Sequence, residues 1–310
     1  MLEVTATREF PAQDYDLDAT LDSGQAFRWH KNGRSWTGII GSKAVRLRAE
    51  PGKIIAETNA PVAEWSWLVD YLQLEVDLSA ILRTFPSDEP MRKALNECRG
   101  LRLLRQDPWE CLASFILSST KQIVQIRQIV ENLCQRFGEK SAASPGFPVF
   151  YSFPSPERLS LVHESELRAC KMGFRAPYLL ATASIIARQQ IVLSSLYDLP
   201  VENARNELMR LPGVGRKIAD CVLLFAYGSQ SAFPVDVWIT KALKKLYFPN
   251  RRPNLKRLHS FASDYFGPYS GYAQQYLFHY MRTKSVLKHV PKRKHAGRES
   301  LRERSATFHE

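Results

Sequence analysis

Up to about residue 80, hydrophobic and polar positions alternate along the chain. The segment AFRWHKNGRSWTGII predicts two strands around Lys31-Asn32-Gly33-Arg34, and AVRLRAEPGKIIAET predicts two more around Pro51-Gly52. An Asn-Gly pair supplies the positive φ angles that a type I′ hairpin needs. The pattern therefore predicts an antiparallel sheet in this part of the chain.

From Glu89 onward, apolar residues recur every three or four positions, as in CLASFILSSTKQIVQIRQIVENLCQRFG, and this spacing predicts helices. The Pro-rich spacer between Ala143 and Leu159 is expected to be a loop that its aromatic residues anchor. The periodicity ends after about Leu287. We therefore predict an α+β protein, mainly α, with an antiparallel β-rich domain over residues 1–103, a helical domain over 104–288 and a basic, mobile tail over 289–310.

Composition places the chain among globular proteins with a polyanionic partner. Of its 310 residues, 45% are hydrophobic and 24% charged, and 43 lysines and arginines against 31 acidic residues give a net charge of +12. The last 27 residues, from Lys284, carry eight basic and three acidic residues, so about +7 remains on the body of the chain. Nucleic acid is the partner that this charge favours.

Several classes of protein are disfavoured by the sequence. The five cysteines are scattered and never spaced as CxxC, which argues against a zinc site, an iron–sulfur cluster or a disulfide framework and favours a reducing, intracellular compartment. No apolar run reaches the roughly 20 residues of a membrane span, and the first residues lack the order of a signal peptide. We expect a soluble protein that is not exported and has no membrane partner.

The segments ENARNELMR and KIADCVLLFAYG predict two helices joined by a turn from Leu211 to Gly215, a hairpin at about residues 203–227. The backbone amides around Gly213, Val214 and Gly215 would then lie beside a helix N-terminus, which suits one phosphate. The alternative is an ordinary turn between packed helices.

Lys217 and Asp236 are the candidate catalytic residues. Lys217 falls in the first helical turn, where the helix dipole disfavours a cation, so a partly desolvated amine there is expected to lose its proton readily and to act as a nucleophile. The alternative is a solvated surface charge. Cys221 lies four residues on and shares the face of Lys217, although such a cysteine is more often a core residue. Asp236 is placed to cap the next helix, and it could also stabilise developing positive charge.

Five ordered segments resemble the helix-hairpin-helix (HhH-GPD) DNA glycosylases, and among these the 8-oxoguanine DNA glycosylase/AP lyases. The segments are LPGVGRKIADC with the following PVDVW, SGQAFRW from Ser23, QDPWECLASFILSS from Gln106, GFRAPY from Gly173 and FGPYSGYAQQYLF from Phe266. The resemblance extends beyond the hairpin over most of residues 15–285. The resemblance implies an HhH-GPD fold and an enzyme of base excision repair that flips a damaged base out of the duplex.

The resemblance also implies the roles of individual residues. Lys217 would attack C1′ of the damaged nucleoside, displace the base and hold the sugar as an imine whose β-elimination cuts the strand on the 3′ side. Asp236 would stabilise the cationic sugar in the transition state. No cofactor is implied, although a monovalent or calcium ion is expected to fit the backbone carbonyls of the hairpin.

Four residues would bind the extruded base. By the resemblance, the Gly24 carbonyl accepts the N7–H that 8-oxoguanine has and guanine lacks, Phe278 and Cys221 sandwich the base, and Gln274 contacts its Watson–Crick edge. Gln274 and Phe278 are four residues apart, so helical spacing puts them on one face. Without the resemblance, Phe278 would be a core residue and Gly24 a turn.

The remaining candidates would contact DNA. Arg175 resembles an arginine that contacts the orphaned cytosine, and Phe174 resembles an aromatic wedge near the vacated stack. Where the eukaryotic enzymes have asparagines and then an arginine, this chain has Thr120, Lys121 and Gln122, followed by Gln125. Fewer bidentate contacts to cytosine predict a relaxed preference for the base opposite the lesion.

Trp238 stands where the eukaryotic enzymes have a histidine near a phosphate. This difference suggests a prokaryotic member of the family, which would act in the cytoplasm, whereas a eukaryotic member would act in the nucleus. The segment STKQI also resembles the alkyl-adenine glycosylases, which lack the catalytic lysine, and Lys217 argues against that branch.

We therefore expect a bifunctional 8-oxoguanine glycosylase/AP lyase, a monomer whose partner is double-stranded DNA containing oxidised guanine. Two alternatives stay open. The first is a glycosylase of the same fold for a ring-opened or alkylated purine. The second, from another class, is a catalytically silent DNA-binding protein that uses the hairpin only to hold backbone phosphate.

Overall fold

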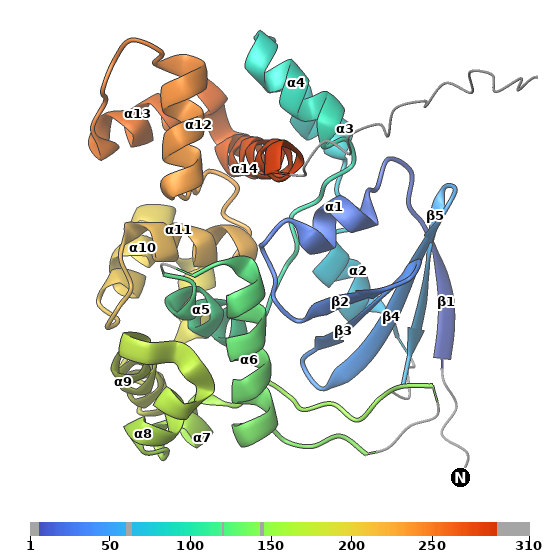
Figure 1. Ribbon diagram of the computed structural model, residues 1–310, viewed down its shortest axis with the longest axis vertical. Helices are drawn as coiled ribbons and strands as arrows, with labels where there is room; N and C mark the ends of the chain where they lie inside the picture. Colours follow the sequence, from blue (N-terminus) through green and yellow to red (C-terminus); the bar gives the residue numbers. More distant parts are fainter. Residues whose placement is uncertain (1–5, 60–63, 120, 143–145, 290–310) are drawn as a thin grey trace, which may run out of the picture.

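A five-stranded antiparallel sheet forms one side of the protein in the computed structural model, which describes residues 6–59, 64–119, 121–142 and 146–289 (Figure 1). The predicted antiparallel sheet and the predicted hairpin around Pro51-Gly52 are confirmed. The strand order is β1-β5-β4-β3-β2. The strands are β1 (Ala6–Pro11), β2 (Trp29–Asn32), β3 (Ser35–Ile40), β4 (Lys43–Glu50) and β5 (Lys53–Thr58).

The first hairpin has a different turn type from the predicted type I′. Asn32 pairs with Ser35, so the two central residues of the turn are Gly33 and Arg34 rather than Asn32 and Gly33. Only Gly33, with φ of +59°, has a positive φ angle. A positive φ at the first central position alone is the type II′ pattern. The prediction was wrong by one residue of register, because Asn32 is the last residue of β2.

Three short helices lie in or next to the region where the sequence predicted only strands. They are α1 (Leu17–Asp22), α2 (Ser66–Leu72) and α3 (Leu78–Leu82). Helices of five to seven residues are too short to produce a clear period of 3.6. The local signal for two of them is the N-cap instead, since Asp16 and Asp77 each accept a hydrogen bond from the third residue beyond them.

The helical side of the molecule packs beside the sheet. Figure 1 shows α5, α6 and α11 in the middle, α12 to α14 with α4 at one end, and α7 to α9 at the other. The helices are α4 (Glu89–Glu97), α5 (Pro108–Leu117), α6 (Ile123–Phe137), α7 (Pro156–Ser160), α8 (Glu164–Leu167), α9 (Ala176–Ala187), α10 (Val201–Met209), α11 (Arg216–Phe225), α12 (Val237–Tyr247), α13 (Leu255–Phe266) and α14 (Ser270–His289), with short turns η1 (Arg168–Met172), η2 (Gly173–Arg175), η3 (Leu193–Asp198) and η4 (Gly267–Tyr269).

Two hydrophobic cores stabilise the fold. One lies against the sheet and includes Leu68 and Leu72 of α2 together with Trp29 and Leu47 of the strands. The other joins the helices, and α3 and α4 contribute to it through residues such as Met91. The predicted domain boundary at residue 103 stays a prediction, and the predicted tail after residue 289 lies outside the described residues.

Two glutamines join the sheet side to the helical side. Gln25 is fully buried, and its amide donates to the carbonyls of Thr20 and Arg102 and accepts from the amide of Leu104. Gln106 donates in turn to the backbone carbonyl of Gln25 at 2.7 Å. Because buried polar groups require partners, these bonds fix the segment after α1 to the strand-like segment before α5.

The segment between α6 and α7 extends from the helical side to the sheet (Figure 1). Phe147 is buried, and the guanidinium of Arg46 on β4 lies 4.9 Å from the centre of its ring. The expectation that aromatic residues anchor this loop is therefore confirmed for Phe147.

None of the helices in the described part of the chain has both the length and the apolar character that crossing a bilayer requires.

Candidate active site

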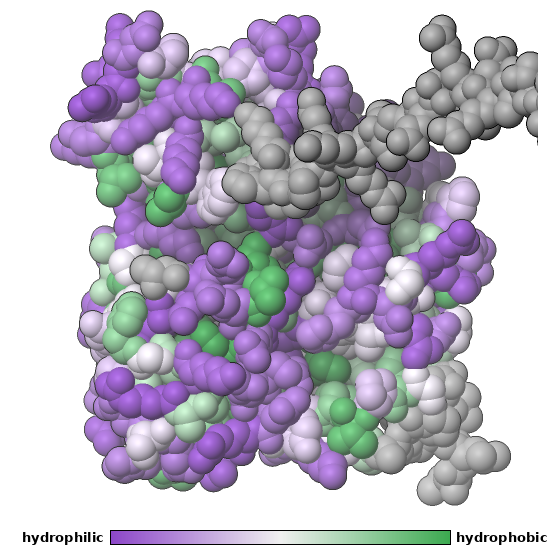
Figure 2. Space-filling view, viewed as in Figure 1, coloured by the Kyte–Doolittle hydropathy of each residue, from purple (hydrophilic) through white to green (hydrophobic). Residues whose placement is uncertain are grey.

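A cavity of about 500 Å³ opens between the helical side and the segment that follows α1. This volume is in the usual range for a small-molecule site. The face of the molecule in Figure 2 is mostly hydrophilic, with small apolar patches near its middle. The cavity brings together these predicted site residues: Gly24, Lys121, Gln122, Lys217, Cys221, Asp236, Trp238, Gln274 and Phe278.

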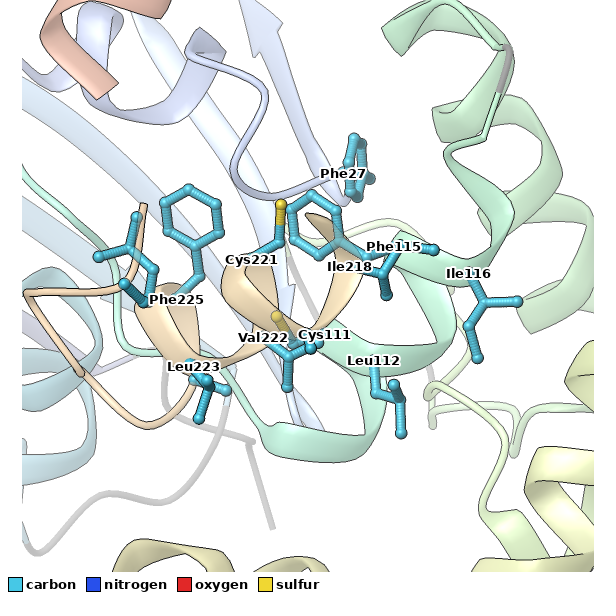
Figure 3. Packing of buried hydrophobic residues seen from close by; sticks show 14 of the residues in the cluster. Phe27, Cys111, Leu112, Phe115, Ile116, Ile218, Cys221, Val222, Leu223 and Phe225 are labelled. Carbon is cyan, nitrogen blue, oxygen red and sulfur yellow. The ribbon is translucent and has the colours of Figure 1, made fainter. Parts of the chain in front are cut away.

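One face of α11 lines the cavity with Lys217 and Cys221. The two residues are four apart and both belong to this cavity wall, as their spacing predicted. Figure 3 shows Cys221 beside the rings of Phe115 and Phe225, on the side of α11 that faces away from Leu223. Burial raises the pKa of the Cys221 thiol to about 12, and Lys217 opposes this only in part. Cys221 is therefore a neutral, polarizable wall rather than a thiolate.

Lys217 is half-buried at the second position of α11, and its amine has two neighbours. Nζ donates a hydrogen bond to Ser118 Oγ at 3.1 Å and lies 5.2 Å from the centre of the Phe115 ring. Both contacts come from α5 or the residue after it. The lysine is therefore not the freely solvated surface charge of the alternative interpretation.

Asp236 is the N-cap of α12, as the sequence predicted. Its Oδ1 accepts a hydrogen bond from the Ile239 amide at 2.7 Å, and the carboxylate also lines the cavity. Burial raises the pKa of Asp236, while the Ile239 amide and the charge of Lys217 counteract that rise. The two predicted roles, helix capping and exposure to the cavity, are thus compatible in one carboxylate.

The opposite wall belongs to α14. Gln274 and Phe278 both line the cavity from this helix. Gln274 is 4% exposed, and its Oε1 has no hydrogen-bond partner among the described residues. An unpaired buried carbonyl costs about 1–3 kcal/mol, so a molecule in the cavity that supplies a donor to this oxygen would remove that cost.

Gly24 lies in the segment between α1 and β2, where the backbone has φ of +81°. A Cβ atom at this position would come within 2.6 Å of Ile123 Cδ1. The positive φ angle strains any larger residue, and the contact would require the Ile123 side chain to move. From α14, the Gln275 side chain donates to the carbonyl of the preceding Ser23 at 3.3 Å, which ties this segment to the helix that carries Gln274.

The predicted hairpin between α10 and α11 is confirmed, and its turn, from Leu211 to Gly215, lies outside the cavity lining. Gly213 and Gly215 are exposed, whereas Val214 is buried. No side chain in the described part of the chain caps the N-terminus of α11, so its first amides stay available to an anion. A buried ion pair between Arg205 and Asp220, at 2.6 Å, holds the two helices together.

Phe174 and Arg175 lie in η2, also away from the cavity lining. Phe174 is 56% exposed, as a wedge would be, and the guanidinium of Arg175 lies 4.2 Å from the centre of its ring. Arg175 itself is buried, with Nη1 donating to the Met172 carbonyl at 3.2 Å. The predicted contacts of both residues with DNA stay predictions.

Three of the remaining candidates also belong to the cavity lining. Lys121 and Gln122 lie between α5 and α6, and Trp238 lies in the first turn of α12 with Lys241 Nζ 5.5 Å from its ring. Thr120 lies outside the described residues.

The described part of the chain holds no group of three or more His, Cys, Asp or Glu side chains that could hold a metal ion. The predicted ion at the hairpin carbonyls uses no such side chains and stays a prediction.

Sequence reasoning missed several residues of the cavity. Ser118 was inside a quoted motif, but nothing in that motif indicated that its hydroxyl meets Lys217. Asp22, Arg127 and Arg282 also line the cavity, and Asp22 accepts hydrogen bonds from both arginines. The signal that could have found Asp22 is its position two residues before Gly24.

Comparisons with known proteins assign both halves of the chain to described families. Residues 9–112 match the 8-oxoguanine DNA glycosylase, N-terminal domain, and residues 113–266 match the HhH-GPD superfamily base excision DNA repair proteins. The chain is 34% identical over 281 residues to the N-glycosylase/DNA lyase OGG1 of Arabidopsis thaliana. The aligned region covers 84% of this chain and 76% of that relative.

Solved structures of 8-oxoguanine glycosylases are also similar to this chain. The structure of MBOgg1 in complex with a low-affinity DNA ligand has a TM-score of 0.86 and 34% identity, covering 92% of this chain and 100% of that one. The 8-oxoguanine glycosylase/lyase of Clostridium acetobutylicum, in complex with double-stranded DNA containing cytosine opposite 8-oxoguanine, has a TM-score of 0.83 and 31% identity. That similarity covers 92% of this chain and 99% of the other.

Proposed function

We propose that this chain, which belongs to the 8-oxoguanine DNA glycosylase/AP lyase family of the HhH-GPD superfamily, excises 8-oxoguanine from duplex DNA. In this proposal the amine of Lys217 attacks the sugar. The protein is a DNA glycosylase with lyase activity, and its partner is DNA. The assignment of individual residues to the steps of this reaction is our proposal.

One observation carries the proposal. Lys217 near the start of α11 and Asp236 at the start of α12 line a single cavity together with Gly24 and Gln274 from opposite ends of the chain. A protein that only held backbone phosphate would need the exposed hairpin and no enclosed cavity with a lysine in its wall. The convergence of a nucleophile, a carboxylate and base-binding groups favours chemistry on a flipped nucleotide.

The reaction begins when the neutral amine of Lys217 attacks C1′ of the flipped nucleotide. The N-glycosidic bond breaks, the base leaves with the bonding electrons and takes up a proton, and the Asp236 carboxylate stabilises the positive charge that develops on the sugar. Opening of the sugar ring gives an imine between Lys217 and C1′. Loss of a C2′ proton then expels the 3′ phosphate by β-elimination, which cuts the strand.

Recognition of the base uses the other walls of the cavity. The unpaired Oε1 of Gln274 supports a donor on the Watson–Crick edge of the base, because a ligand that supplies one relieves a buried unsatisfied group. Phe278 and the neutral Cys221 offer apolar surfaces for the two faces of the ring. The Gly24 carbonyl would distinguish the N7–H of 8-oxoguanine from the N7 lone pair of guanine.

A lesion panel tests the substrate. Single-turnover base release is measured on duplexes that carry 8-oxoguanine, a ring-opened purine, an alkylated adenine or undamaged guanine, each opposite cytosine. The proposal predicts the fastest release for 8-oxoguanine. Faster release of the alkylated adenine would contradict it, and binding without release from any duplex would support the catalytically silent alternative.

A further inference from the structure

A cluster of three charged residues, Asp22, Arg127 and Arg282, forms the part of the cavity wall next to Gly24. We call it the Asp22 cluster. Asp22 ends α1, Arg127 belongs to α6 and Arg282 to α14. Arg127 Nη2 lies 2.9 Å from Asp22 Oδ1, and Arg282 Nη2 lies 3.0 Å from Asp22 Oδ2. One carboxylate therefore joins three elements that are far apart in sequence.

The Asp22 cluster also holds the backbone of the segment between α1 and β2. Besides its ion pair, Arg282 Nη2 donates to the main-chain carbonyl of Asp22. A Cβ atom on Gly24 would lie 3.4 Å from Arg282 Nη1, so the guanidinium is directly beside the glycine. The position of Gly24 relative to α14 is thus set through Asp22 and Arg282, with the Gln275 bond to Ser23 as a second tie.

Asp22 carries the negative charge that balances the two arginines, and its own side chain is 48% exposed. Two guanidinium groups share one carboxylate, and their side chains are only 21% and 17% exposed. Burial lowers the pKa of Arg282, Asp22 opposes this, and Arg127 adds to it by repulsion. Without the carboxylate, two partly desolvated positive charges would face each other across the same gap, and like charges at such a place repel.

We propose that the Asp22 cluster positions the Gly24 carbonyl against α14 and thereby sets how strongly the cavity distinguishes 8-oxoguanine from guanine. Asp22, Arg127 and Arg282 are positioning residues, since they act through Gly24. The inference rests on the proposed function, because it concerns the recognition of the same base in the same cavity.

The first test compares two reactions of one enzyme. Excision of 8-oxoguanine depends on the Gly24 carbonyl, whereas cleavage at a preformed abasic site requires Lys217 but no base. For Asp22→Asn, the rate of excision is expected to fall at least about tenfold, and cleavage at the abasic site to stay within about twofold. Asp18→Asn is the matched control, because Asp18 is another carboxylate of α1 that pairs with Lys31 at 2.6 Å, away from the cavity.

The second test uses the repulsion between the two arginines. Replacing Arg127 by methionine removes one of the opposed charges, so Asp22→Asn/Arg127→Met is expected to excise 8-oxoguanine faster than Asp22→Asn alone. A merely structural role of Asp22 would instead make the double variant as poor as the single one or worse.

The third test measures recognition without chemistry. In a Lys217→Gln background, which cannot form the imine, the affinity for a duplex with 8-oxoguanine is compared with that for an undamaged duplex. Adding Asp22→Asn is expected to lower this ratio by about tenfold.

Three results would overturn the inference. They are excision by Asp22→Asn at the native rate, an equal fall in excision and in abasic-site cleavage, and an unchanged affinity ratio. Failure of the native protein to release 8-oxoguanine while cleaving abasic sites would overturn the proposed substrate itself and the inference with it.

Discussion

Lys217 and Ser118, which are 99 residues apart in sequence, meet in the cavity: the amine donates to Ser118 Oγ at 3.1 Å. The serine hydroxyl has a single proton, and it donates this to the carbonyl of Phe115 at 2.7 Å. Its lone pairs therefore face Lys217, which makes Ser118 an acceptor that holds the amine in one orientation. The sugar has to arrive at this amine for the proposed reaction to begin.

Ser118→Ala is expected to slow imine formation about tenfold, because an intramolecular hydrogen bond contributes about 0.5–1.5 kcal/mol and its loss leaves the amine free to adopt other rotamers. The measurement is the single-turnover rate of borohydride trapping on DNA with 8-oxoguanine. Ser118→Thr keeps the hydroxyl and should recover most of the rate. A Ser118→Ala variant as fast as the native protein would exclude this role.

Asp236→Asn is expected to lose about 100-fold in the rate of base release, since one preorganised electrostatic group contributes about that much to a transition state. The neutral amide cannot stabilise the positive sugar. Binding of the lesion duplex should change little, and this separates loss of catalysis from loss of affinity. Equal losses in affinity and rate would count against the proposed role.

The same substitution should stabilise the fold at neutral pH. Burial raises the pKa of Asp236 in the folded protein, so the folded state holds this proton more tightly than the unfolded chain. Stability that the protonated form provides is therefore lost as pH rises through the folded pKa. Asparagine keeps the N-cap and removes this cost, so its melting temperature should exceed that of the native protein by a few degrees at pH 7. The difference should shrink as pH falls toward 3.8, the ordinary aspartate pKa.

Two glycines of the hairpin should respond differently to alanine. A Cβ on Gly215 would meet nothing within 4 Å, whereas one on Gly213, with φ of +78°, would lie 2.8 Å from Tyr178 Cβ. Gly215→Ala should therefore keep the melting temperature but weaken binding to undamaged duplex by about tenfold, if a phosphate approaches the α11 amides. Gly213→Ala should lower the melting temperature. Unchanged DNA binding by Gly215→Ala would argue against a phosphate at this turn.

The sequence also predicts a relaxed preference for the base opposite the lesion. Lys121, Gln122 and Gln125 offer fewer bidentate contacts to cytosine than asparagines and an arginine would, and each such pair contributes about 1–3 kcal/mol. Excision of 8-oxoguanine is compared opposite each of the four bases. A rate opposite cytosine at least about 100-fold above all three others, or roughly 2.7 kcal/mol, would contradict the prediction.

Sequence alone predicted the parts of the site that local spacing controls. Lys217 and Cys221 are four residues apart on one helix, as are Gln274 and Phe278, and both pairs line the cavity. Asp236 combined an N-cap position with a preceding proline, and the structure confirms the cap. A single helix or turn was enough to place each of these residues on its face.

Contacts between distant segments were not predictable in the same way. Asp22 and Arg282 are 260 residues apart, and an isolated ion pair between such segments has no period that a sequence pattern could reveal. Ser118 meets Lys217 only because α5 packs against α11. The buried position of Arg175 likewise depends on the fold around it.

Borohydride trapping on a duplex with one 8-oxoguanine opposite cytosine identifies the nucleophile. The native protein, Lys217→Gln and Lys121→Gln are compared, since Lys121 is a second lysine in the wall of the same cavity. We expect a covalent adduct for the native protein and for Lys121→Gln, none for Lys217→Gln, and none on undamaged DNA. A lesion-dependent adduct that persists in Lys217→Gln would show that another amine is the nucleophile.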